Sequence, residues 1–205
     1  MSRTEPAGAP RPLARGALPA DTVALARFLI GKTLVRATAA GIRAVRIVET
    51  EAYVADDPAS HAYRGQTRRN AAMFLRRGHA YVYIAYGCWP VLNVSSEAEG
   101  IGTAVLLRAG EPLAEADGNG APGPKAASGP GRLARHLGIT LAEDGADLCS
   151  GGPLHLAAAT RPAGPIAVGP RIGITKAAER PLRFFELGNA AVSGPARGNR
   201  KPGPP

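Results

Sequence analysis

The sequence predicts one mixed α/β (α+β) domain with a strand-rich antiparallel core, flanking helices and a protruding β-hairpin. Segments rich in β-branched and aromatic residues recur along the chain and are separated by turn residues, as is typical of sheets. Two segments show helical spacing that ends at a glycine. The chain has 205 residues, 45% of them hydrophobic, which is enough for one domain, or a tight pair, with a buried core.

The first expected element is a helix over residues 22–31, with Asp21 as its N-cap and Gly31 as its end. The side chains that this helix should bury are those of Val23, Leu25, Phe28 and Leu29. Strands are expected over 32–36 and 42–54, followed by an irregular, arginine-rich segment over 55–80.

The second half of the chain continues the strand pattern. Strands over 79–87 and 91–96 are expected to form a hairpin around Tyr86 and Gly87, and another strand to cover 103–113. A short helix over 131–140 carries Leu133 and Leu137 and closes at Gly138. The last expected strands are 165–175 and 182–187.

Composition divides the chain into a central domain and two ends. Residues 1–18 are expected to be a flexible arm, 19–193 the domain, and 194–205 a disordered basic tail. Within the domain, the glycine- and alanine-rich segment 114–130 is expected to be a low-complexity surface loop.

The charge balance favours a polyanionic partner. The formal net charge is +9 and the isoelectric point is about 10.2. Residues 62–80 contain five arginines and no acidic residue, and 171–201 contain a second basic cluster. Nucleic acid or an anionic membrane surface would suit such patches. Solvated surface charge alone is the alternative for any single arginine.

The sequence lacks a cysteine framework, a secretory signal and a transmembrane segment, which narrows the expected cellular location. Cys88 and Cys149 have neither the number nor the spacing of a disulfide framework or a zinc site, which favours a reducing cytosol. The proline-broken N-terminus has no apolar core of a secretory signal. No apolar run of about 18 residues occurs, so we expect no transmembrane helix and no membrane partner.

The stretch "IVETEAYVADDPASHAYRG" places two glutamates inside an expected strand. Side chains alternate along a strand, so Glu49, Glu51 and Tyr53 should share one face. A carboxylate such as Glu51 could activate water and stabilise positive charge on a sugar. Tyr53, His61 and Tyr83 could hold the flat face and polar edges of a nucleobase. Pairing of either glutamate with an arginine, and ordinary strand tyrosines, are the structural alternatives.

Tyr86 precedes Gly87 at the expected hairpin tip. An exposed aromatic side chain flanked by arginines could insert into a stack of bases. Cys88 and Trp89, which follow, are expected to serve packing rather than chemistry.

A long ordered set of motifs resembles the alkyladenine (3-methyladenine) DNA glycosylase family. The matching stretches include "VETEAY", "HAYRGQTRRN", "AYVYIAYG", "LNV", "LLRAGEPL", "GPGRL", "PRIGI" and "PLRFF", and the similarity runs from about residue 19 to 193. The resemblance implies a monofunctional enzyme of base excision repair. Such an enzyme flips alkylated or deaminated purines out of double-stranded DNA and hydrolyses their N-glycosidic bond, without metal or other cofactor.

The resemblance also implies a role for individual residues. Glu51 corresponds to the general base and Arg108 to the arginine that positions the attacking water. The implied base pocket consists of Tyr53, His61, Tyr83, Asn93 and Ile172, with Asn93 opposing the guanine 2-amino group. Tyr86 corresponds to the residue that fills the gap in the duplex. Glu49 has no implied chemical role and is expected to be a structural partner.

Contacts to the DNA backbone are expected from Arg64, Arg68, Arg69 and Lys176. The sequence departs from the family at Arg68, where proline is common, and at Cys88, Trp89 and Pro90, where methionine and bulky residues are usual. The segment 114–130 has Lys125 as its only basic residue, although relatives often carry arginines there.

Three other functions remain open from the sequence. A non-catalytic nucleic-acid-binding module would keep the arginines and Tyr86 but would not need Glu51 or Arg108. A carbohydrate glycosidase could use Glu49 and Glu51, although the net charge fits a polyanion better. The third is an enzyme of similar fold that acts on ribonucleotides or tRNA, since a fold does not determine function. We expect a monomer, located in the cytoplasm near the nucleoid in a bacterium and in the nucleus in a eukaryote.

Overall fold

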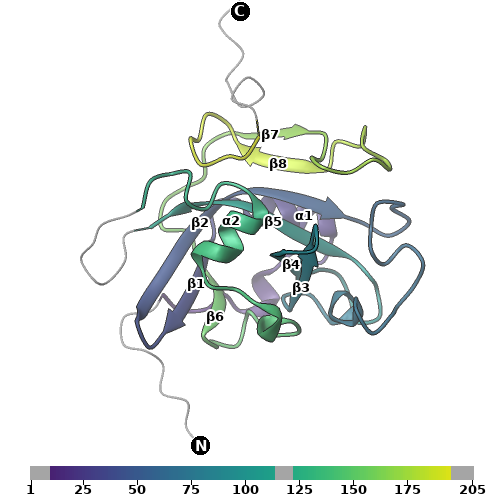
Figure 1. The fold of residues 1–205 in the computed structure, drawn as a ribbon, viewed down its shortest axis with the longest axis horizontal. Coiled ribbons are helices and arrows are strands. Elements are labelled where there is room, and N and C mark those ends of the chain that lie inside the picture. The colour runs from purple at the N-terminus through teal and green to yellow at the C-terminus, as the bar shows by residue number, and fades with distance from the viewer. Residues whose placement is uncertain (1–9, 114–121, 195–205) are drawn as a thin grey trace, which may run out of the picture.

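A computed structural model describes residues 10–113 and 122–194 (Figure 1). The strands are β1 (Thr33–Thr38), β2 (Gly41–Tyr53), β3 (Ala80–Ala85), β4 (Trp89–Ser95), β5 (Ala104–Pro112), β6 (Leu154–Ala157), β7 (Ile166–Gly169) and β8 (Arg183–Glu186). The α-helices are α1 (Thr22–Leu29) and α2 (Pro130–His136), and the short 3-10 helices are η1 (Arg15–Ala17), η2 (Ala71–Phe74) and η3 (Leu141–Glu143). The predicted α+β domain with an antiparallel core is confirmed.

All eight strands belong to one antiparallel sheet, in which the path β3-β4-β5-β2-β1-β6 is joined by β8 beside β2 and by β7 beside β8. The 13-residue strand β2 connects these parts. It pairs with β5 along one edge, and on the other edge with β1 first and then, at Glu49–Glu51, with β8. The hairpin of β7 and β8 lies at the top of Figure 1, alongside the last part of β2.

Strand β2 changes the face that it turns to the core. Its register against β5 shifts twice, between Ile47 and Glu49 and between Glu49 and Thr50. Before these shifts Val45 and Ile47 lie in the main core, and after them Ala52 does, while the Thr50 hydroxyl donates to a carbonyl of α1. A bulge re-aims side chains in this way, so both glutamates point away from the main core.

The helices close the main core from one side of the sheet. In α1 the Asp21 carboxylate accepts a hydrogen bond of 2.7 Å from the Ala24 amide, which confirms the predicted cap. Leu25 and Leu29 are fully buried, but Val23 and Phe28 are only partly buried. Short α2 buries Leu133 and Leu137, as predicted, and the next residue, Gly138, has a positive φ of 61°.

Three segments differ from the predictions. Only Ile166–Gly169 of the expected strand 165–175 is a strand, because Pro170 has no N–H to pair and the buried side chain of Arg171 holds the chain in a loop. Strand β6, which was not predicted, pairs with β1. The expected hairpin strand 91–96 instead begins at Trp89.

The described part of the expected arm is packed against the domain. The Leu13 amide donates to the Leu156 carbonyl at 2.7 Å, Arg15 forms an ion pair with Asp147, and Leu18 is buried. Residues 1–9 and 195–205, and residues 114–121 of the expected low-complexity loop, lie outside the described residues. No helix within the described ranges is long and apolar enough to cross a bilayer.

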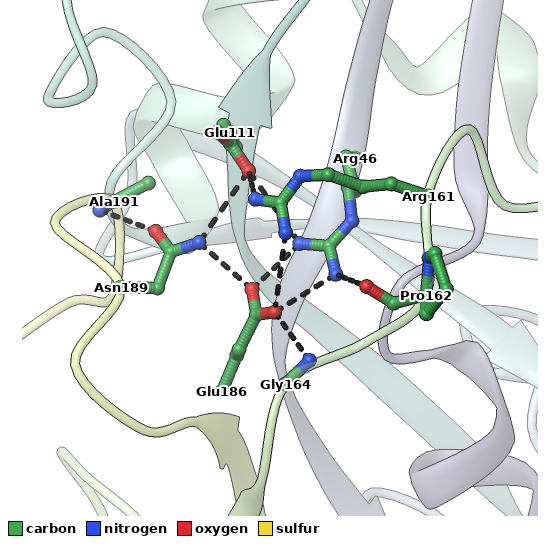
Figure 2. A network of polar contacts seen from close by, with 8 residues as sticks. All are labelled: Arg46, Glu111, Arg161, Pro162, Gly164, Glu186, Asn189 and Ala191. Carbon is green, nitrogen blue, oxygen red and sulfur yellow. Dashed lines mark hydrogen bonds and ion pairs between the residues drawn. The ribbon is translucent and has the colours of Figure 1, made fainter.

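A buried arginine anchors the β7–β8 hairpin to β2 (Figure 2). Arg46 of β2 donates to both carboxylate oxygens of Glu186 at the end of β8, at 2.6 and 2.9 Å. Glu186 also accepts from the Gly164 amide and from Asn189. Glu111 and Arg161 complete this network, which we call the anchoring cluster.

Candidate active site

The face of the sheet opposite the main core carries the predicted site residues. On β3 and β4, core residues alternate with Tyr81, Tyr83 and Asn93, and on β5 Arg108 follows the core residue Leu107. The bulge in β2 adds Glu49, Glu51 and Tyr53 to this face. Period-two alternation on four neighbouring strands therefore brings residues that are distant in the sequence to one place.

Glu51 is fully buried and has three partners on the protein. Its Oε1 accepts a 2.8 Å hydrogen bond from the Ile172 amide and lies 3.1 Å from Nη1 of Arg108. Its Oε2 accepts from the Tyr53 hydroxyl at 3.1 Å. Burial raises the pKa of Glu51 above the usual value of 4.5, although Arg108, the Ile172 amide and Tyr53 act in the opposite direction.

Arg108 connects the two glutamates. Its Nε donates to Oε1 of Glu49 at 3.1 Å, and its Nη1 also contacts the Ile172 carbonyl at 3.4 Å. Glu49 accepts a second bond of 2.6 Å from Arg183 and a third, of 2.7 Å, from the Ser193 amide. Glu49 is thus a structural partner of two arginines, which is the role expected for it. We call Glu49, Glu51, Arg108 and Arg183 the site cluster.

A cavity of about 340 Å³ is lined by Tyr53, whose hydroxyl bonds Glu51, although Glu51 itself is not part of the lining. The residues that line it are Tyr53, Ala59, His61, Met73, Tyr81, Tyr83, Ile84, Ala85, Tyr86, Asn93, Gly173 and Ile174. Four of the five predicted base-pocket residues are among them. The fifth, Ile172, gives only its backbone, to Glu51 and Arg108, and its neighbours Gly173 and Ile174 form the wall instead.

One wall of the cavity consists of three rings in mutual contact. The ring centroids of His61 and Tyr83 are 4.4 Å apart, and Tyr81 stacks on Tyr83 at 5.4 Å. Nδ1 of His61 lies 2.8 Å from the Tyr81 hydroxyl. Burial lowers the pKa of His61, so its imidazole is neutral at pH 7. Asn93 is fixed by a 3.1 Å bond to the Tyr81 carbonyl.

The ring of Tyr53 contacts an ion pair, Arg171–Asp57, that was not predicted from the sequence. The Arg171 guanidinium carbon is 4.7 Å from the centroid of the Tyr53 ring, and Arg171 pairs with Asp57. Arg171 lies in "PRIGI", from which only Ile172 was selected. The property that marks Arg171 as important is its burial, and burial of an arginine in a loop cannot be recognised from the sequence.

Tyr86 occupies the tip of the β3–β4 hairpin and is 84% exposed. Its φ of 49° and the φ of 75° at Gly87 form the tight turn that joins the two strands. The Tyr86 hydroxyl reaches the Gly173 carbonyl at 3.4 Å, so the tip lies at the mouth of the cavity.

The four expected backbone contacts are all exposed. Arg68 and Arg69 line a second cavity of about 670 Å³, which shares His61, Tyr81 and Tyr83 with the first. Arg64 lies in the loop after His61, and Lys176 in the loop between β7 and β8. Within the described part of the chain, no group of three or more histidine, cysteine, aspartate or glutamate side chains could hold a metal ion.

Comparison with known proteins shows the family to which the chain belongs. The family model described as methylpurine-DNA glycosylase matches residues 17–190. A protein of Mesorhizobium japonicum is 54% identical over 192 residues, covering 90% of this chain and 91% of the relative. A Paraburkholderia phytofirmans protein is 49% identical over 191 residues, covering 91% and 90%, and one from Methanocella arvoryzae is 45% identical over 192 residues, covering 87% and 94%.

All three relatives carry the provisional name 3-methyladenine DNA glycosylase. The family match spans most of the chain, and it includes every strand and helix that contributes a residue to the cavity. The chain therefore belongs to the methylpurine-DNA glycosylase family, a family of DNA-binding enzymes that hydrolyse N-glycosyl bonds in DNA repair.

Proposed function

We propose that this protein removes alkylated or deaminated purines from double-stranded DNA by hydrolysis of the N-glycosidic bond. The observation that carries the proposal is a fully buried carboxylate, Glu51, bonded to Tyr53, which lines a cavity together with other aromatic rings. A carboxylate with a raised pKa is a better proton acceptor than an ordinary one. A binding module without catalysis would not need a buried glutamate and its arginine partner at this position.

In the proposed reaction water attacks C1′ of the deoxyribose while the bond to the purine nitrogen breaks. Glu51 accepts the proton of the water, and the bond's electron pair leaves with the base. A cationic alkylated purine leaves as a neutral molecule, whereas a neutral deaminated purine leaves as an anion and then takes up a proton. The products are a free purine and an abasic site in an intact strand. The negative charge of Glu51 also stabilises the positive charge that develops on the sugar. Arg108 and the Ile172 amide hold the carboxylate in position.

The cavity walls suit a purine that has left the base stack. Tyr53 offers a platform on one side, and His61 and Tyr83 face the cavity on the other. If the Tyr81 hydroxyl donates to Nδ1 of neutral His61, the ring proton is on Nε2, which can then donate to the base. Asn93 is proposed to oppose an exocyclic 2-amino group.

The proposed duplex would contact both sides of the hairpin tip. Tyr86 would fill the space that the flipped nucleotide leaves. A further cavity of about 450 Å³ on the α2 side of the tip is lined in part by Tyr86, Trp89, Arg132 and Arg135. With Arg64, Arg68, Arg69 and Lys176, these basic side chains supply contacts for phosphates. We propose that the protein binds and processes DNA as a monomer.

The test is base release from duplexes that carry a single hypoxanthine, ethenoadenine or alkylated purine. We expect free base and an abasic strand that breaks only after alkali or heat. Glu51→Gln should lower release by about 10²–10⁴-fold while the variant still binds the lesion duplex. Binding without release by the unaltered protein would instead identify a non-catalytic module.

A further inference from the structure

Arg171 and Asp57 form an ion pair in which both side chains are fully buried. Nη2 of Arg171 donates to Oδ1 of Asp57 at 3.0 Å, and Nη1 donates to Oδ2. The two residues are 114 positions apart in the sequence. Removal of two charges from water is costly, and apolar residues of similar volume often replace such a pair without loss of stability. Stability alone therefore does not explain the pair, and its position relative to the cavity indicates its role.

The pair joins three segments that form the cavity. Arg171 donates to the Ala52 carbonyl in β2 at 3.1 Å and to the Ala177 carbonyl at 3.3 Å. Asp57 accepts a 3.0 Å bond from the Ala59 amide, and Ala59 lines the cavity. The pair thus fixes the strand that carries Tyr53 and the loop that leads to His61.

The guanidinium of Arg171 lies over the ring of Tyr53 at 4.7 Å. Tyr53 lines the cavity, whereas Arg171 does not. The ring therefore has a fixed cation over one side and the space for a base on another. An aromatic face attracts cations through its quadrupole, and a cation already held on the ring weakens that attraction for a second one.

We propose that the Arg171–Asp57 pair determines how well Tyr53 accepts positively charged bases relative to neutral ones. This inference rests on the proposed function. A base stacked on Tyr53 would lie about 3.5–4 Å from the ring, and thus roughly 8 Å from Arg171. The charge of Arg171 would repel a cationic N-methylated purine over that distance, and the adjacent Asp57 carboxylate cancels most of the repulsion. Asp57 is therefore the counter-ion that allows a charged base to stack.

The experiment compares two lesions in the same duplex sequence under single-turnover conditions. N7-methylguanine is cationic as a nucleotide, and hypoxanthine is neutral. Asp57→Asn leaves the shape of the pair but removes the counter-charge, because arginine stays protonated. The ratio of N7-methylguanine release to hypoxanthine release should fall by about threefold to tenfold relative to the unaltered protein.

The double variant Arg171→Met with Asp57→Leu removes the cation and its partner together. Here the same ratio should rise, but by a smaller factor of about twofold, because in the unaltered protein the carboxylate already cancels most of the repulsion. The matched control is Asp147→Asn, which breaks the ion pair of Asp147 with Arg15 away from the cavity and should leave the ratio unchanged. Both lesions are tested on one preparation, so the ratio does not depend on the folded fraction.

A purely structural pair would lower both rates in proportion. An unchanged ratio in the two variants therefore overturns the inference, as does a shift in the same direction in both. If Asp57→Asn gives no folded protein, the ratio of the double variant decides alone. An unaltered protein that releases neither base would contradict the proposed function itself, which is a distinguishable result.

Discussion

Strand β2 carries one arginine–carboxylate cluster on each side of its bulge, and the two clusters contain the same groups. The anchoring cluster joins Arg46 and Arg161 to Glu111 and Glu186 (Figure 2). The site cluster joins Arg108 and Arg183 to Glu49 and Glu51. Each therefore has two positive and two negative side chains, yet the pKa of Glu186 is lowered and the pKa of Glu51 is raised.

In the anchoring cluster every oxygen of the central carboxylate is well supplied with donors. Glu186 accepts two bonds from Arg46, one from the Gly164 amide and one from Asn189, all between 2.6 and 2.9 Å. Burial alone would raise the pKa of Glu186, but these bonds lower it to about 2. A carboxylate held in this way remains ionised and fixes the β7–β8 hairpin.

In the site cluster the donors are distributed unequally. Glu49 takes bonds from Arg108, Arg183 and the Ser193 amide, whereas Glu51 shares Arg108 and otherwise has one amide and one hydroxyl. Burial of Glu51 then outweighs its partners, and the neighbouring charge of Glu49 adds to the rise in its pKa. The comparison teaches that the balance between burial and hydrogen-bond donors, rather than the charge count, separates an anchor from a base.

The largest expected effect comes from removal of the base. Glu51→Gln should lower the rate of base release by about 10²–10⁴-fold, the usual contribution of a general base, because an amide cannot accept the proton of the attacking water. Binding to lesion duplex should stay nearly intact. Single-turnover release and a binding titration on the same duplex measure both quantities.

The control for this variant is Glu49→Gln in the same cluster. It should lower release much less, since Glu49 bonds two arginines and the Ser193 amide, whereas Glu51 bonds Tyr53, which lines the cavity. A deeper loss of release in Glu49→Gln than in Glu51→Gln would show that the base has been assigned to the wrong glutamate.

The next effect is on stability and concerns the anchoring cluster. Glu186→Gln leaves the buried Arg46 with only the 3.4 Å contact to Glu111 as an ion pair, and breaking such a buried pair costs about 3–5 kcal/mol of the free energy of unfolding. Denaturant unfolding of the variant and of the unaltered protein measures the difference. Release by the fraction that remains folded should be much less affected, and destabilisation within about 0.5 kcal/mol would show that the network is not an anchor.

Patterns of residues predicted the fold well where a local rule applies. The Asp21 cap, the end of α1 near Gly31 and the hairpin around Tyr86 all follow from short-range chemistry. Strand β6 was missed because four residues carry too little periodicity. The bulge in β2 was not visible either, because it depends on pairing with β5 and not on β2 alone.

The site was less accessible to pattern than the fold. Alternation placed Glu49, Glu51 and Tyr53 on one face, side-chain chemistry indicated His61, Tyr83 and Tyr86, and family resemblance added Asn93 among the residues that line the cavity. Neither could identify the Arg171–Asp57 pair. Its members lie in loops, where no period applies, and burial is the property that distinguishes them from surface charges.

A smaller effect is expected at the hairpin tip, next to the site cluster. Tyr86→Ala removes the exposed ring and should weaken binding to lesion duplex by about 1–3 kcal/mol, the usual value of one base–aromatic stack. Release from a single-stranded lesion should fall less, because an unpaired base costs little to flip. Equal losses on duplex and single strand would make Tyr86 a packing residue.

The matched control for the tip is Val168→Ala on β7. Val168 is also an exposed, large hydrophobic residue, at 41%, but it lies on the hairpin that the anchoring cluster holds. Its truncation should leave binding to duplex unchanged. Fluorescence anisotropy of labelled duplexes compares the two variants directly.

The smallest expected effect is a difference between the pH at which acid stops base release and the pH at which acid destabilises the fold. The first depends on the site cluster and the second on the anchoring cluster. Glu51 acts as a base only when ionised, and its pKa is raised, so release should decline with acid above the usual 4.5. Glu186 has a folded pKa of about 2, below its unfolded value near 4.5. Its contribution to stability is therefore complete above pH 4.5 and is lost between 4.5 and 2. Between the two limits the protein should be folded and inactive, which parallel profiles of release and of unfolding free energy would reveal. Coincident limits would mean that activity follows unfolding, and a Glu51→Gln profile that keeps the upper limit would assign it to another group.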